Sequence, residues 1–151
     1  MTDTQGTPEE EPGRTEIDDL VDQGKENPTV RGLTPLYQAT FDLPAWHFVG
    51  VGVFPNVSPL CATVDDIGYV MAFTSADRAR YYAKKRGVLA FGDKPSILNF
   101  PVREAVRLCL AQRRRADVKA VLFDDGWGNW YFPLEALPSL LKRYLPDEAA
   151  S

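Results

Sequence analysis

Residues 119–138 read "KAVLFDDGWGNWYFPLEALP", and this stretch decides the fold. An apolar run ends in two aspartates, a turn containing two glycines follows, and a second apolar run returns. Asp, Gly and Asn tolerate positive φ in tight reversals. We therefore predict two strands, "VKAVLF" and Trp130–Phe132, that pair as a hairpin. A helical first turn at 133–137 and an amphipathic helix should follow, because Pro138 cannot lie deep in a helix.

The segments before this hairpin supply the remaining predicted elements. Ser75 and Gly87 are placed to cap the two ends of a helix. Pro101 suits the first position of another helix, which follows a short strand. In chain order we predict a helical turn at 35–41, a strand at 46–54, a hairpin with arms 60–64 and 69–73, a helix at 76–86, a strand at 96–100 and a helix from 101.

This order predicts an α+β fold, with a mixed sheet and helices packed mainly on one face. The chain contains no internal repeat. Its 151 residues are enough for one ordinary domain with its own core. We assign that single small domain to residues 33–146, with a C-terminal tail at 147–151.

Residues 1–32 differ in composition from the rest of the chain. They hold nine acidic side chains against three basic ones and contain no aromatic residue. A segment with so little apolar surface to bury cannot offset the entropy lost on ordering. We therefore expect residues 1–32 to form a disordered acidic tail.

Cysteine usage and hydropathy give the expected compartment. Cys61 and Cys109 lie in apolar surroundings without CxxC spacing, so two reduced, packed thiols are expected rather than a disulfide. The N-terminus lacks the basic and then apolar pattern of a secretory signal. Apolar runs are far shorter than the roughly 20 residues of a membrane span. These features predict a cytoplasmic protein without a membrane partner.

The pair Asp124–Asp125 invites two catalytic or metal-binding interpretations, and both fit poorly. Haloacid dehalogenase-type phosphatases have two aspartates at a strand end with one residue between them, so both carboxylates lie on the same side. Asp124 and Asp125 are adjacent, so in an extended chain they point to opposite faces. In a calcium loop starting at Asp124, the next ligand positions would be Gly126 and Gly128, which carry no side-chain oxygen. We interpret the stretch as a turn and predict no metal, cofactor or catalytic residue.

A turn does not require the large aromatic Trp127 between two glycines. The side chain could fold back on the sheet, or it could be an exposed anchor for a partner, because Trp is enriched at interaction hot spots. Our candidate partner-binding residues are Asp124, Asp125, Trp127, Asn129 and Trp130.

Two alternatives remain open at this point. A small metal-assisted hydrolase could use Asp65, Asp66, Asp124 and Asp125, if their two turns lie at the same end of the sheet. The basic residues at 78–86 could grip phosphates. However, cations at a helix C-terminus are favourable in themselves, so we expect solvated helix ends and no nucleic-acid partner.

Three stretches carry a resemblance to a known family: "YVMAFTSADRARYYA", "SILNFPVREAVRLCL" and "VKAVLFDDGWGNWYFPLEAL". Their order resembles the N-terminal domain of the SseB family (serine-sensitivity enhancing protein B), over about residues 44–145. Where that family tends to carry Asn-Pro after the last strand, this chain has Asp124-Asp125-Gly126. The resemblance implies a bacterial protein-interaction module without catalytic residues, of an accessory or immunity type.

Overall fold

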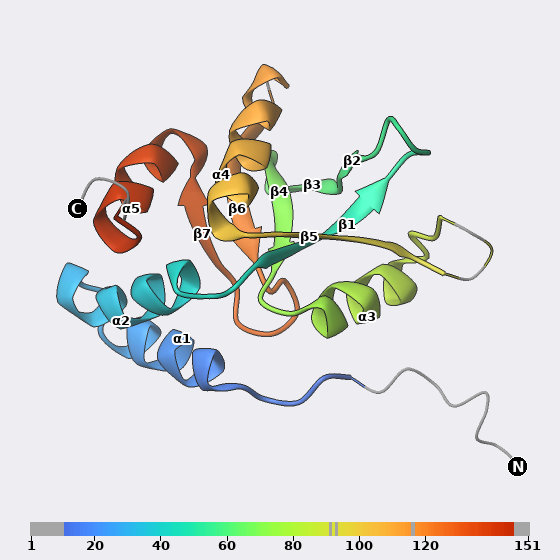
Figure 1. The fold of residues 1–151 in the computed structure, drawn as a ribbon. Coiled ribbons are helices and arrows are strands. Elements are labelled where there is room, and N and C mark those ends of the chain that lie inside the picture. The colour runs from blue at the N-terminus through green and yellow to red at the C-terminus, as the bar shows by residue number, and fades with distance from the viewer. Residues whose placement is uncertain (1–10, 91, 93, 116, 147–151) are drawn as a thin grey trace, which may run out of the picture.

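The fold is built on one mixed β-sheet with helices on both of its faces (Figure 1). We describe it from a computed structural model, which covers residues 11–90, 92, 94–115 and 117–146. The elements in chain order are α1 (Glu16–Glu26), α2 (Val30–Phe41), β1 (Trp46–Val51), β2 (Ser58–Pro59), β3 (Cys61–Val64), β4 (Ile67–Phe73), α3 (Ala76–Arg86), β5 (Ser96–Phe100), α4 (Val102–Ala111), β6 (Val118–Phe123), β7 (Trp130–Pro133) and α5 (Leu137–Tyr144).

The central pair of the sheet is β4 and β6, which run parallel. The other pairs are antiparallel, with β5 next to β1 and β7 next to β6. Strands β1 and β4 pair directly at one end, and β2 and β3 lie between them at the other. Leu60 links β1 to β4 there, because its N–H donates to the Val49 carbonyl and its own carbonyl accepts from the Met71 N–H. The predicted α+β fold with a mixed sheet is confirmed.

Strict alternation along β4 divides the interior into two cores. Val70 and Ala72 face the larger core, beneath α1, α2, α4 and α5. Met71 and Phe73 face the smaller one, which α3 covers. Successive side chains of a strand point to opposite faces, so one strand of apolar residues serves both layers. Most helices therefore lie on one face, as predicted, and α3 lies on the other.

Local signals set the ends of several elements where the sequence predicts them. Asp65 and Asp66 both have positive φ, 52° and 69°, in a two-residue turn, so β4 begins at Ile67, two residues before the predicted arm. The Ser75 hydroxyl accepts a hydrogen bond from the Arg78 N–H at the start of α3, and Gly87 ends that helix with φ 71°. Strand β1 ends at Val51, three residues before the predicted limit, and α2 begins at Val30, five residues before the predicted turn.

The structure corrects the expected disordered tail over residues 11–32. Residues 11–32 include the whole of α1 and the start of α2, while residues 1–10 and 147–151 lie outside the described part of the chain. Ile17 and Val21 of α1 are buried in the larger core, and Leu20 packs against it. Their spacing of three and four residues forms one apolar helix face. This narrow stripe anchors a helix that the acidic composition alone argues against.

The start of α1 is fixed by a capping box. Thr15 is the N-cap residue, and its N–H donates to the Asp18 carboxylate over 2.9 Å. Acidic residues in the first turn also complement the positive end of the helix dipole. The charge that suggested disorder thus contributes to helix stability.

Both cysteines are free thiols, as expected. Cys109 is fully buried in the larger core, and Cys61 is half-buried. Burial raises the pKa of each thiol, so neither is activated as a nucleophile. Within the described residues, no helix is long and apolar enough to cross a membrane.

Candidate interaction surface beside a buried ion network

Asp124 directly follows β6 and joins the end of that strand to the end of β4. Its backbone N–H donates to the Ala72 carbonyl over 2.9 Å. Its carboxylate accepts hydrogen bonds from the N–H and the hydroxyl of Thr74, each over 2.9 Å. Asp124 has φ 51°, a conformation that Asp tolerates better than most residues. The side chain is fully buried, so it forms part of the framework beneath the loop.

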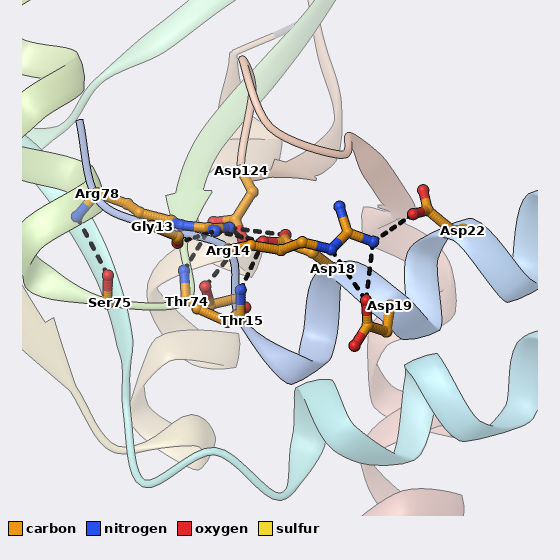
Figure 2. Close-up of polar contacts among 10 residues, drawn as sticks. All are labelled: Gly13, Arg14, Thr15, Asp18, Asp19, Asp22, Thr74, Ser75, Arg78 and Asp124. Atoms are coloured by element: carbon orange, nitrogen blue, oxygen red, sulfur yellow. Dashed lines mark hydrogen bonds and ion pairs between the residues drawn. The ribbon is translucent and has the colours of Figure 1, made fainter.

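Arg78 of α3 lies at the centre of this network (Figure 2). Its side chain is fully buried, and its Nη1 donates to Asp124 over 2.8 Å and to Asp18 over 3.0 Å. Its Nη2 donates to the second Asp18 oxygen over 2.5 Å and to the Gly13 carbonyl over 3.1 Å. One guanidinium therefore ties together α1, α3 and the end of β6. Removing one member of such a buried network typically costs about 3–5 kcal/mol.

The two carboxylates that share this guanidinium are perturbed in opposite directions. Burial raises the pKa of Asp124, although the hydrogen bonds from Thr74 and Arg78 favour its charged form. Burial also opposes the charged form of Asp18, but hydrogen bonds from Arg78 and the Thr15 N–H outweigh it and lower the pKa of Asp18. Two negative charges against one positive charge leave the network with a net negative charge.

Trp127 folds back onto α3 and the smaller core. Its ring lies 4.8 Å from the Arg78 guanidinium carbon, in a cation–π arrangement. Ring contacts to Phe73 and Tyr81 have centroid distances of 6.4 Å and 6.0 Å. The backbone N–H of Trp127 closes a tight turn by donating to the Asp124 carbonyl over 2.9 Å. Trp127 remains half-buried, so part of its ring reaches the surface.

Asp125 connects the loop to the last turns of α3. It accepts hydrogen bonds from the Tyr82 hydroxyl over 3.2 Å and from Arg86 over 3.5 Å. Asn129 donates to the other Asp125 oxygen and accepts from the N–H of Gly126, each over 3.2 Å. These contacts hold the exposed part of the loop in one shape. Asp125 is partly exposed and Asn129 is exposed, so both lie where a partner could reach them.

The other two candidate residues, Asp124 and Trp130, lie in the interior, which corrects their expected place at the surface. Trp130 is 7% exposed and stacks on Phe123 at 5.3 Å between ring centroids. It alternates with Tyr131, which points outward from β7 and is 54% exposed. The strand period therefore places Trp130 inward, and the same reasoning could have been applied to the sequence.

Helix α1 contacts the loop from the other side. The Lys25 ammonium donates to the Gly128 carbonyl over 2.7 Å. A Cβ at Gly128 would lie 3.0 Å from Cγ1 of Val21, so the absence of a side chain allows the close approach of α1. Gly128 thus has a packing role that the turn alone does not explain.

The metal-assisted hydrolase fails its geometric requirement. Asp65 and Asp66 precede β4, whereas Asp124 and Asp125 follow β6. Because β4 and β6 are parallel, the two aspartate pairs lie at opposite ends of the sheet. Among the described residues, no group of three or more His, Cys, Asp or Glu side chains is placed to hold a metal ion.

A cavity of about 300 Å³ is lined by residues of the loop and of α3. We call its rim the α3–loop surface, and it combines aromatic rings with the cations of the last helical turn. Its lining includes Tyr81, Tyr82, Lys85, Arg86, Asp125 and Trp127.

Sequence reasoning found the loop but missed Arg78, Asp18 and Thr74. Arg78 is one residue before Ala79 and four before Tyr82, on the buried face of α3. A cation on the buried face of a helix indicates a buried acidic partner. The several basic residues of 78–86 instead favoured the interpretation that Arg78 is solvated.

In comparisons with known proteins, no family model, no curated protein and no solved structure matches this chain.

Proposed function

We propose that this chain is a non-enzymatic module that binds another protein through the α3–loop surface. The observation that carries the proposal is the half-buried Trp127, held against Tyr81 and Arg78 at the edge of a cavity. A rigid aromatic side chain loses little conformational entropy on binding, and Trp, Tyr and Arg dominate interaction hot spots.

The hydrogen bonds around Asp125 support the same proposal. They fix the loop before any partner arrives, and a preorganised surface loses less free energy on association. Arg86 lies over the Tyr82 ring at 4.5 Å, so the rim offers charge and flat apolar surface together. A bacterial partner and an accessory or immunity-type role would fit the SseB-like order of the segments.

Trp127→Ala tests the surface. We expect capture of specific partners by the tagged full-length chain to fall at least about tenfold, because a hot-spot side chain contributes about 2 kcal/mol or more. Capture is compared by quantitative mass spectrometry. Tyr81→Ala is a second variant at the same rim, needed because Trp127 also packs against Phe73.

Phe54→Ala is the matched control. Phe54 is 85% exposed, and it belongs to the segment between β1 and β2, not to the rim of this cavity. It should leave capture unchanged. Folding of each variant is checked by circular dichroism and urea unfolding, and equal capture by folded Trp127 and Tyr81 variants would refute the proposed surface.

A further inference from the structure

A second concave surface lies on the other side of the buried ion network from the α3–loop cavity. This groove has a volume of about 480 Å³ and runs between the first turns of α1, the end of α2 and the start of the segment into α3. Its apolar lining comes from Ile17, Leu20, Ala39, Leu43 and Pro44.

Both formal charges among the residues that line the groove are negative, and the positive end of the α1 dipole offsets only about half a charge. Glu16 and Asp42 are its charged side chains, and both are exposed. Thr15, Thr74 and Ser75 line the same groove and lie beside the buried network (Figure 2). That network adds a further net negative charge, since Arg78 faces both Asp18 and Asp124.

Helix α2 strengthens this field. It ends at Phe41 with Asp42 as its C-cap residue, and its last turn contains no basic side chain. The C-terminal end of a helix carries a partial negative charge, so Asp42 adds a like charge to it. A cation supplied by another molecule would offset both the Asp42 charge and the partial negative charge at the end of α2. The side chains of residues 1–10 and 147–151 include acidic groups and no Lys or Arg.

We infer that this groove binds a segment of a partner protein in which an apolar side chain is flanked by Lys or Arg. The apolar side chain packs between Leu20, Ala39 and Leu43, and the cations lie against Glu16 and Asp42. Association is steered by the negative field and therefore weakens as salt screens it. The groove is separate from the α3–loop surface, so it stands or falls independently of the proposed function.

The test uses the full chain and two short fluorescein-labelled peptides, measured by fluorescence polarisation. One peptide alternates leucines with lysines, and the other carries glutamates in place of the lysines. We expect the first to bind with an affinity that falls steeply with added salt, and the second not to bind. Glu16→Gln/Asp42→Asn should weaken binding about tenfold or more. Ala39→Phe, which fills the groove without changing its charge, should abolish binding.

Asp65→Asn/Asp66→Asn is the matched control. It removes the same two charges at the opposite end of the sheet, and Asn tolerates the positive φ of that turn. Binding by this variant should equal that of the wild type. The inference is overturned if the lysine peptide does not bind, if both peptides bind equally, or if the control loses as much affinity as the groove variants.

Discussion

At the scale of single residues, Arg78 shows how one buried cation can organise sequence-distant segments. Its guanidinium holds Asp18 from α1 and Asp124 from the end of β6, and the Trp127 ring covers it. The sequence could not reveal this role, because an Arg in a helix with several other basic residues looks solvated. A hydrogen-bonding partner 46 residues away is fixed only by the tertiary fold.

Asp18 should give the network a measurable dependence on pH. Its pKa is lowered in the folded protein from an ordinary value of 3.8, so its carboxylate stabilises the fold above that value. This contribution is lost as the pH falls through the lowered pKa. Asn keeps an acceptor oxygen and Arg78 keeps its pair with Asp124, so the cost should be smaller than for loss of the side chain. We therefore expect Asp18→Asn to reduce the free energy of unfolding by about 1–3 kcal/mol at neutral pH, and by less as the pH falls below 3.8.

The measurement is urea unfolding at a series of pH values. Asp124 has the opposite shift and remains in both proteins. Asp19→Asn is the control, since Asp19 lies next in sequence with an exposed side chain. A cost of Asp18→Asn that stays constant across the pH range would contradict the assignment.

At the scale of elements, the packing of α1 against the loop depends on a close approach of two residues. Gly128→Ala would place a methyl group 3.0 Å from Val21 Cγ1, and such overpacking costs about 1–3 kcal/mol. Val21→Ala removes apolar volume from the larger core. In the double variant the new methyl fits the vacated space, so the cost should be less than the sum of the single costs.

A double-mutant cycle by urea unfolding measures this coupling. Val106→Ala combined with Gly128→Ala serves as the control, because Val106 is a buried valine of α4 on the same core, whereas the three atoms nearest the added methyl all belong to Val21. The unfolding free-energy changes of the control pair should be additive. If those of the Val21 pair are additive as well, α1 is not closely packed against the loop.

The elements also differ in how far local sequence determines them. Strand β5 and the buried face of α4 match the prediction, because Pro101, the strand length and the helical spacing of Val102, Ala105, Val106 and Cys109 are local signals. Helix α1 was missed because its apolar stripe is narrow and lies among acidic residues, so composition outweighed periodicity. The groove could not be predicted, since it forms only where α1, α2 and the segment before α3 converge.

At the scale of the whole molecule, the two cores meet at β4 and β6, which are covered on both faces (Figure 1). Native-state hydrogen exchange should therefore find the slowest amides in these two strands. Amides of β7 should exchange faster, because β7 pairs with β6 alone and carries the exposed Tyr131. Equal protection of β7 and β4 would contradict this ranking.

The connection of α1 to the rest of the domain has a consequence for synthesis on the ribosome. Helix α1 is translated first, yet Arg78 lies 60 residues after Asp18, and Gly128 lies 103 residues after Lys25. The Asp18 contact cannot form until α3 has left the exit tunnel, and the Lys25 contact cannot form until the β6–β7 turn has followed it. The contact of α1 with the β6–β7 turn must therefore form late in folding, although α1 is the first helix of the described chain to emerge.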